Sequence, residues 1–220
     1  MKTLLSIFLV FLVGSGVAQE SNKKKVLVVP YDRFEFVSEF DLDMIAEKNG
    51  VTKDEVYLLY QKTILQAFDE HQDENFKFVP MDRDLFKPYK HLIKYESGKF
   101  RGKNFNAVDL SGFSEKDFEK LLQDHGCDFV IFLTWYDIQK EAHMKNDGRR
   151  KRVPYAGHYL DYDVYNLFKQ RVVGLGRVKA VAPKPNDKEA DFALLRTQEV
   201  LKAYDQFITT VIDQLNNPIQ

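Results

Sequence analysis

The sequence predicts an α/β fold in which one mixed β-sheet of about five or more strands packs against about three helices. Two observations predict this class. Short apolar runs alternate with amphipathic helical segments in the first part of the chain, an order that favours parallel strands with helical crossovers. Later, two β-rich runs follow each other with almost no connection, and such a pair forms an antiparallel hairpin.

The first elements alternate strand and helix. Residues 26–29 form a short aliphatic run closed by Pro30, and residues 76–79 form another closed by Pro80, as expected of buried strands. The sequence Thr-Lys-Asp-Glu at 52–55 has the form of a capping box, which marks a helix start. A stripe of apolar residues at four-residue spacing predicts the core-facing side of this helix: Val56, Tyr60, Ile64 and Phe68.

The middle of the chain breaks this rhythm. Residues 87–109 carry scattered lysine–aromatic pairs and two glycines, which predicts an inserted flap or hairpin. Ser114 then stands where a helix N-cap is expected, and Gly126 where a left-handed C-terminal cap is expected. Residues 129–133 are the most apolar segment after the leader and predict the central strand, with Cys127 beside it.

The last third predicts a turn, a hairpin and a helix. Asn-Asp-Gly at 146–148 is a turn sequence. Residues 159–168 and 171–181 are β-rich and predict the two strands of the hairpin. Apolar residues then recur at alternating spacings of four and three, which predicts a long amphipathic helix over residues ~187–215, packed on the sheet.

Residues 1–18 have the order of a secretory signal: one lysine, an apolar run, and small residues before a cleavage site after Ala18. The run is about half the ~20 residues needed to cross a bilayer, so no transmembrane anchor is expected. No cysteine stands at the cleavage site to carry a lipid. We therefore expect residues 19–220 to be a single exported domain, periplasmic or secreted, with the insert near residues 87–109.

The charge balance and the cysteine content exclude several classes of function and of site. The chain has 32 basic and 33 acidic side chains, a balance that argues against a dedicated nucleic-acid binder. The only cysteine is Cys127, which excludes an intramolecular disulfide and a multi-cysteine zinc site and, in an apolar neighbourhood, predicts an inert thiol. The five histidines have no metal-binding spacing, and the sequence contains no serine-hydrolase elbow. It predicts no metal, no cofactor and no catalytic residue.

A repeated pattern marks the ends of the two early strands. Val-Pro-Tyr-Asp-Arg at 29–33 is echoed by Val-Pro-Met-Asp-Arg at 79–83. If the two strands are parallel neighbours, both ends lie at the carboxyl edge of the sheet, where open α/β sheets hold ligands. One interpretation is a polar-ligand site; the other is that each proline ends its strand and each aspartate caps the next turn. The residues concerned are Asp32, Arg33, Asp82 and Arg83.

The largest local excess of charge is basic. Residues 87–105 contain six lysine or arginine side chains against one glutamate, interleaved with four aromatic residues, and Gly-Arg-Arg-Lys-Arg at 148–152 adds four cations in a predicted loop. In an exported protein such patches can meet anionic lipid, polysaccharide or an acidic protein face; solvated loops are the alternative. The predicted contact residues are Lys94, Lys99, Phe100, Arg101, Lys103, Arg149, Arg150 and Arg152.

Carboxylates carry a rival hypothesis, a hydrolase acting on an envelope polymer. Four of them lie within residues 35–43, and Asp161 and Asp163 share one face of a predicted strand. Paired carboxylates act as general acid and base in glycoside hydrolysis. The alternative for Asp161 and Asp163 is a solvated sheet face, and nothing in the sequence makes the first group converge.

The order of elements resembles the α/β domain shared by the curli-secretion lipoprotein, the lipoprotein activators of penicillin-binding proteins and the amino-terminal domain of the Tol translocation protein. The likeness rests on an opening strand at 25–30, a second at 76–79, and a strand at 128–134 after a helix that ends near a glycine. The chain departs from the two lipoprotein types in lacking the acylated cysteine, and its insert fits none of the group clearly.

That group is non-catalytic, so the resemblance implies a binding or assembly role in the cell envelope. We expect an exported protein whose partner is an envelope protein, an anionic lipid or a polysaccharide. A carrier of a small ligand, held at the Asp–Arg edge, is a further alternative.

Overall fold

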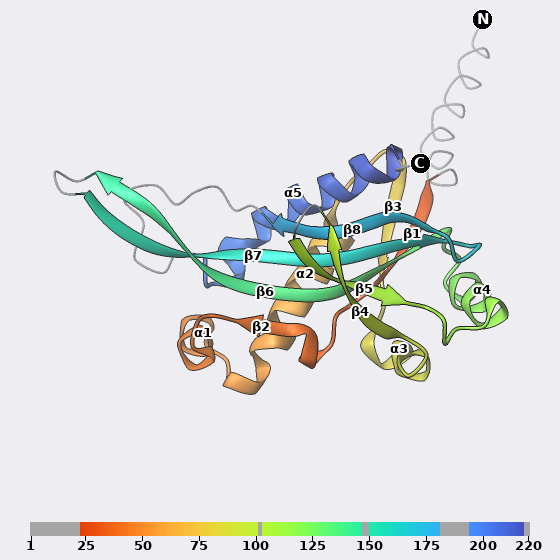
Figure 1. Ribbon diagram of the computed structural model, residues 1–220, viewed down its shortest axis with the longest axis horizontal. Helices are drawn as coiled ribbons and strands as arrows, with labels where there is room; N and C mark the ends of the chain where they lie inside the picture. Colours follow the sequence, from red (N-terminus) through yellow and green to blue (C-terminus); the bar gives the residue numbers. More distant parts are fainter. Residues whose placement is uncertain (1–22, 101–102, 147–149, 181–193, 218–220) are drawn as a thin grey trace, which may run out of the picture.

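Six strands form one mixed sheet in the computed structural model, which describes residues 23–100, 103–146, 150–180 and 194–217 (Figure 1). The order along the sheet is β3-β1-β6-β7-β8, and β2 also pairs with β6. Neighbours β3, β1 and β6 run parallel, whereas β6, β7 and β8 are antiparallel, so the predicted mixed α/β sheet is confirmed. The strands are β1 (Lys24–Val29), β2 (Phe36–Ser38), β3 (Phe76–Pro80), β6 (Phe129–Asn146), β7 (Arg150–Asn166) and β8 (Arg171–Ala180).

The predicted central strand opens β6, which lies in the middle of the sheet. Ile131 and Leu133 belong to the core on one face, while Val130 and Phe132 belong to the core on the other. None of the four is more than 1% exposed, because successive strand residues point to opposite faces and both faces are covered. Cys127 is buried just before the strand.

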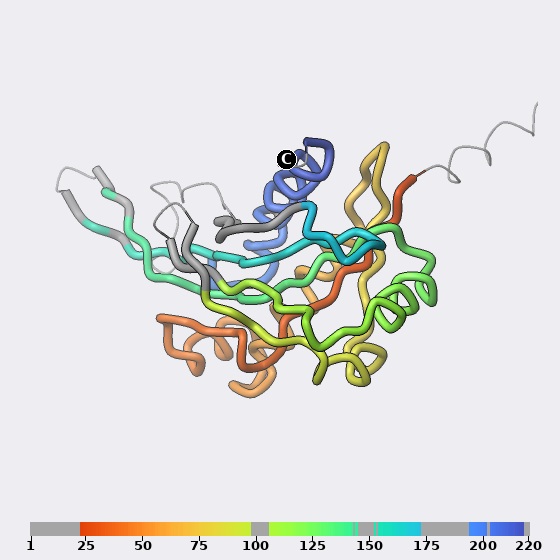
Figure 2. Tube along the Cα trace, turned by 45° about the vertical axis from the view of Figure 1, so that its right-hand side comes forward, coloured from red at the N-terminus to blue at the C-terminus, as the bar shows by residue number. Residues whose placement is uncertain are grey.

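The two faces are covered differently. One core cluster joins the sheet to helices α1 (Leu42–Asn49), α2 (Val56–Glu70) and α5 (Thr197–Asn216). The other joins it to α3 (Arg83–Lys90), α4 (Glu115–Asp124) and a separate two-stranded sheet of β4 (Lys94–Phe100) and β5 (Lys103–Asp109). Figure 2 shows this hairpin running across the main sheet. Within the described ranges, no helix is long and apolar enough to cross a membrane.

Local signals predicted these elements well where they act within one turn. Val56, Tyr60, Ile64 and Phe68 are all fully buried and form the core side of α2, as predicted. The Ser114 hydroxyl accepts from the Asp117 amide at 3.0 Å and caps α4, also as predicted. Gly126 has a φ of 59°, the left-handed conformation that favours glycine.

Other expectations need correction. The last helix is described from Thr197 onward; residues 194–196 of the predicted helix are not helical, and residues 187–193 lie outside the described ranges. Two short helices, α1 and α3, were not predicted, so the described part of the chain has five α-helices. The predicted loop at 148–152 is wrong for Arg150–Arg152, which belong to β7 and pair with Met144–Asn146 of β6.

The extension of β6 and β7 explains that error. Together the two strands form a long antiparallel ribbon that projects beyond the body of the molecule (Figure 1). Near the tip the sequence of both strands is mostly polar and charged, so it lacks the alternation of apolar and polar residues that marks a half-buried strand. The turn predicted at 146–148 falls largely on residues outside the described ranges.

The β4–β5 hairpin docks on the sheet through two buried aspartates. Asp161 accepts from the Asn106 amide at 3.0 Å, and Asp163 accepts from the Val108 amide at 2.7 Å. These amides lie on the edge of β5 that faces away from β4, where the carboxylates take the place of a neighbouring strand. The solvated face expected for Asp161 and Asp163 is therefore wrong, since they are only 2% and 1% exposed.

A candidate basic crevice at the carboxyl ends of β1 and β3

The crevice begins where the chain interrupts its pairing with β6. β1 pairs with Phe129–Phe132 and β2 pairs with Tyr136–Ile138, both in parallel. The residues between them, 30–35, leave the ladder and end in a short 3₁₀ turn, in which the Asp32 amide donates to Glu35 Oε2 at 2.6 Å. β1 and β2 thus behave as one strand with a gap, and the gap opens at the carboxyl end of β1.

The second Asp–Arg segment reaches the same edge. β3 is the parallel neighbour of β1, so residues 79–83 end beside residues 29–33. Asp82 caps α3 by accepting from the Asp84 amide at 2.7 Å, which is the capping role considered for it. The helix then turns Arg83, Lys87 and Lys90 toward one side, because residues three and four apart share a helix face.

Asp32 joins the two segments. Arg83 Nη2 lies 3.1 Å from Asp32 Oδ1, and Lys90 forms an ion pair with the other carboxylate oxygen. Arg83 Nη1 also donates to the Tyr57 hydroxyl at 2.9 Å. The guanidinium groups of Arg33 and Arg83 lie 5.5 and 5.8 Å from the centre of the Tyr57 ring, within cation–π range.

These contacts enclose a crevice of about 120 Å³. That volume is below the ~300–1,000 Å³ of pockets for whole small molecules, and suits a single phosphate- or carboxylate-sized group. Its lining carries three cations and one carboxylate. The lining residues are Pro30, Tyr31, Asp32, Arg83, Phe86, Lys87, Lys90 and Tyr95.

Two further carboxyl groups lie close to the crevice. Lys87 lies 2.5 Å from Asp84 and lowers the pKa of that carboxyl, so Asp84 stays ionised and offsets the charge of Lys87. Burial raises the pKa of Glu35, which shifts it toward its neutral form. Asp32 and Asp84 together leave one of the three lining cations without a matching negative charge.

The predicted site residues fall into three separate places. Asp32, Arg33 and Arg83 meet at the crevice, with Asp82 as the helix cap beside it. Lys94 is exposed in β4, next to the lining residue Tyr95. The remaining residues lie toward the turn of the hairpin (Lys99, Phe100 and Lys103) or near the ribbon tip (Arg150 and Arg152), and Arg101 and Arg149 lie outside the described ranges.

Tyr57 was not anticipated. It lies one residue beyond the first member of the buried stripe of α2, and no short-range signal links it to Arg33 or Arg83. Lys87 and Lys90 were visible as part of the basic run, but the ion pair of Lys90 with Asp32 depends on the strand order, which places residues far apart in sequence side by side.

The carboxylates of the rival hydrolase hypothesis each have a structural contact. Asp41 caps α1 through the Asp43 amide at 2.9 Å, and Asp43 pairs with Lys53 at 2.8 Å. Glu39 accepts from the Lys140 amide at 2.6 Å. Among the described residues no group of three histidine, cysteine, aspartate or glutamate side chains is arranged to hold a metal ion.

Comparison with known proteins assigns no family. No family model matches the chain, and no curated protein matches it. A crystal structure of a neuraminyllactose-binding hemagglutinin homolog from Helicobacter pylori is similar at a TM-score of 0.38 and 9% identity, over 89% of this chain and 86% of that one. The crystal structure of lipoprotein GNA1162 from Neisseria meningitidis is similar at a TM-score of 0.33 and 12% identity, over 88% of this chain and 99% of that one. At these TM-scores neither structure assigns a function. Neither belongs by name to the curli-secretion, penicillin-binding-protein activator and Tol group that the order of elements resembles.

Proposed function

We propose that the chain is an exported, non-catalytic binding protein of the cell envelope, and that the basic crevice takes an anionic group of an envelope component. The observation that carries the proposal is the convergence of Arg83, Lys87 and Lys90 on a small crevice whose one lining carboxylate is Asp32. Clustered cations in a recess attract an anion more strongly than the same cations spread over a surface.

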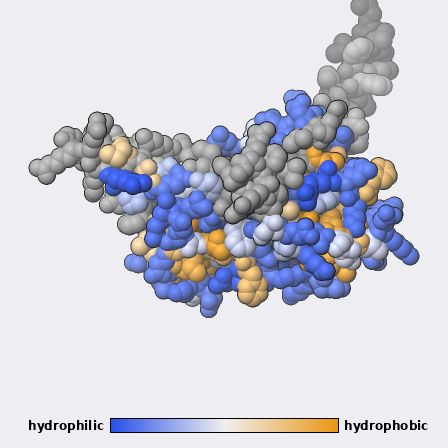
Figure 3. Space-filling model, viewed as in Figure 1, coloured by the Kyte–Doolittle hydropathy of each residue, from blue (hydrophilic) through white to orange (hydrophobic). Residues whose placement is uncertain are grey.

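The surroundings of the crevice support an envelope ligand. Phe34 follows the first Asp–Arg pair and is 84% exposed, and Leu85 follows the second and is 57% exposed. Figure 3 shows apolar side chains reaching the surface among hydrophilic ones on this view of the molecule. Cations beside exposed apolar side chains suit the interface of an anionic lipid layer, where the apolar groups insert and the cations meet phosphates.

The hairpin and the ribbon tip extend the same proposal. Lys94, Lys99, Phe100 and Lys103 would contact the ligand layer from the hairpin, and Arg150 and Arg152 would contact it near the ribbon tip. Arg101 and Arg149, which lie outside the described ranges, belong to the same proposal by their charge. These residues supply long-range attraction rather than an enclosed site.

Sedimentation with lipid vesicles tests the proposal. Phosphatidylglycerol vesicles should bind the protein at low salt, phosphatidylcholine vesicles should not, and binding should fall as salt rises, since exposed charges are screened over ~8 Å at physiological ionic strength. The K87Q/K90Q variant should bind roughly 30-fold more weakly, because each lysine near an anionic surface contributes about 1 kcal/mol. The matched control is K116Q/K120Q, which removes two exposed lysines from helix α4, also a short helix on the same face of the sheet.

Equal losses in the two double variants would mean that net charge, not the crevice, governs binding, and would overturn the proposed site. Inorganic phosphate serves as a competitor. Phosphate could bind to saturation while anionic vesicles and isolated envelope do not bind. That result would identify the protein as a carrier of a small anion and would overturn the proposed envelope role.

A further inference from the structure

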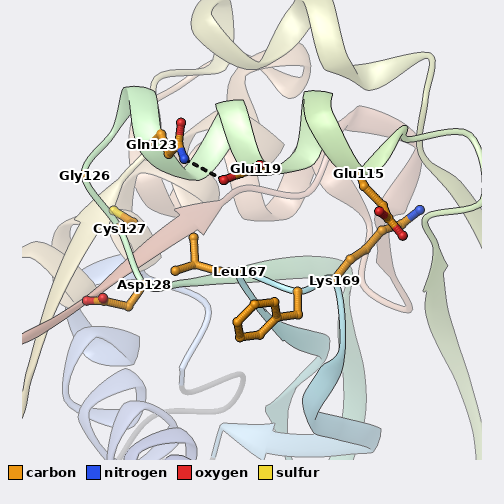
Figure 4. A pocket seen from close by; sticks show the side chains of 9 residues that line it. Glu115, Glu119, Gln123, Gly126, Cys127, Asp128, Leu167 and Lys169 are labelled. Carbon is orange, nitrogen blue, oxygen red and sulfur yellow. Dashed lines mark hydrogen bonds between the residues drawn. The ribbon is translucent and has the colours of Figure 1, made fainter.

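A second and larger recess lies at the other end of the parallel strands. It has a volume of about 680 Å³ and opens between α4, the start of β6 and the turn that joins β7 to β8 (Figure 4). Asp128 and Cys127 enter it from the amino end of β6, whereas Asp32 belongs to the carboxyl end of β1. The residues that line it are Glu115, Glu119, Gln123, Gly126, Cys127, Asp128, Leu167, Phe168 and Lys169.

The charge of this recess is opposite to that of the basic crevice. Three carboxylates line it against one amine, and the amine, Lys169 Nζ, donates to the Phe113 carbonyl at 2.7 Å. Glu115 and Glu119 stand one turn apart on the same face of α4, followed by Gln123, which donates to Glu119 at 2.8 Å. Figure 4 shows these side chains along one wall, with Asp128 on the opposite side.

The turn between β7 and β8 adds two apolar side chains to this lining, Leu167 and Phe168. Phe168 is 81% exposed and Leu167 is 38% exposed. Their turn is held firmly: Asn166 Oδ1 accepts from the amides of Phe168 and Gln170, both at 3.0 Å. Lys169 adopts a φ of 57° to complete the turn.

A rigid turn that displays a large aromatic side chain has already lost the conformational freedom that binding would otherwise remove. Exposed aromatic residues in such settings are common energetic centres of protein interfaces. The fold gains little from Phe168 in return, since its ring is left in solvent.

We propose that this acidic recess binds a basic peptide segment of a partner protein, in which lysine or arginine side chains flank an apolar one. The carboxylates are spread along a helix face and across the recess, so they match several cations at peptide spacing better than one small amine. Leu167 and Phe168 then contact the apolar side chain. The proposal does not depend on the function proposed for the basic crevice.

Fluorescence anisotropy with the full chain tests this inference. The probe is a labelled peptide of alternating lysine and leucine pairs, and its counterpart carries glutamate in place of lysine. We expect the lysine peptide alone to bind. The E115Q/E119Q variant should bind it about three- to tenfold more weakly, and F168S about tenfold more weakly. The matched control, D69N/E74Q, removes two exposed carboxylates elsewhere and should leave the affinity unchanged.

Thermal unfolding midpoints of the variants should match that of the parent protein, because all substituted side chains are exposed. If F168S unfolds early, Phe168→Tyr supplies the second test and should bind as the parent does. Absence of binding at low salt, or equal losses in E115Q/E119Q and D69N/E74Q, overturns the proposal. So does spermidine that binds as tightly as the peptide, because the recess would then be a site for small organic cations.

Discussion

The basic crevice and the acidic recess lie at opposite ends of the same parallel strands, and they differ in how their charges are used. In the crevice, Asp32 already pairs with Arg83 and Lys90, so part of the positive charge is neutralised inside the protein. In the recess, Glu115 and Glu119 lie on an exposed helix face, and the lining lysine bonds to a backbone carbonyl. The crevice is small and internally bonded, whereas the recess is large and displays an exposed aromatic.

The two ends of one sheet thus support two kinds of contact. The carboxyl ends of β1 and β3 receive an interruption of the sheet and the first turn of α3, which makes a narrow space with fixed cations. The amino end of β6 receives the C-terminal end of α4 and a tight turn, which makes a broad open space. A small anion suits the first space, and an extended segment suits the second.

Replacing Ile131 by alanine should weaken both regions together. The side chain is fully buried in the central strand, so the change should cost roughly 2 to 5 kcal/mol of unfolding free energy through lost burial and a residual cavity. Denaturant unfolding measures the loss. A cost below about 0.5 kcal/mol would show that this strand does not support both ends of the sheet.

Lowering the pH should also act on both regions at once, through His158. Burial lowers its pKa to about 4 from an ordinary value of 6.5, so the folded protein holds the neutral ring. Above pH 6.5 the ring is neutral in both the folded and the unfolded protein, and its contribution to the free energy of unfolding is complete. Between pH 6.5 and about 4 the unfolded protein takes up the proton first, so the free energy of unfolding falls by about 3 kcal/mol in total.

The ring is held between two fixed groups: His158 Nε2 donates to the Leu194 carbonyl at 2.8 Å, which leaves Nδ1 to accept from the Tyr136 hydroxyl. Unfolding curves at several pH values check the prediction. His158→Gln should be less stable at neutral pH and should lose most of the slope between pH 6.5 and 4. An unchanged slope in that variant would assign the acid sensitivity to other groups.

Asp163→Ala should separate the two regions. The substitution leaves the Val108 amide without its acceptor and removes the ion pair with Arg171 at 3.2 Å. The free energy of unfolding should therefore fall by about 1 to 3 kcal/mol. The hairpin supplies Tyr95 to the basic crevice, so anionic binding should weaken while peptide binding at the recess is retained. The affinities for anionic vesicles and for the lysine peptide are measured side by side on this variant. Equal losses of the two affinities would mean that the hairpin does not act on the crevice alone.

The smallest effect on stability is expected from changing Lys94, Lys99, Arg101 and Lys103 together to serine. These residues carry the charge of the insert, so adsorption to isolated envelope should fall while the unfolding midpoint stays nearly unchanged. Adsorption that survives the fourfold change would place the anionic contact at the crevice without help from the hairpin.

Sequence patterns predicted the parts of the fold that depend on near neighbours. The stripe from Val56 to Phe68 depends on a spacing of about one helical turn, the caps at Ser114 and Gly126 act within one turn, and all three are confirmed. The meeting of the two Asp–Arg segments was expected on the condition that two short apolar runs are parallel neighbours, and β1 and β3 pair in that way.

The same patterns could not predict contacts between residues far apart in the sequence. The alternation of Asp161 and Asp163 with other residues predicts a solvent-facing side, and only the hairpin, some 55 residues away in sequence, buries them. The acidic recess was missed for the same reason: Glu115, Asp128 and Phe168 come from three separate elements. No short-range signal distinguishes such residues from an ordinary solvated surface.

The gap between β1 and β2 has a consequence for how this protein can vary. Because β2 resumes its pairing with β6 at Phe36 and the chain crosses residues 30–35 without ladder bonds, the length of that crossing is not tied to the register of the sheet. Insertions beside the exposed Phe34 would lengthen one wall of the crevice and leave the buried Tyr31 and the strands in place. The fold thus offers a position at which ligand size can be altered, by selection or by design, without rebuilding the core.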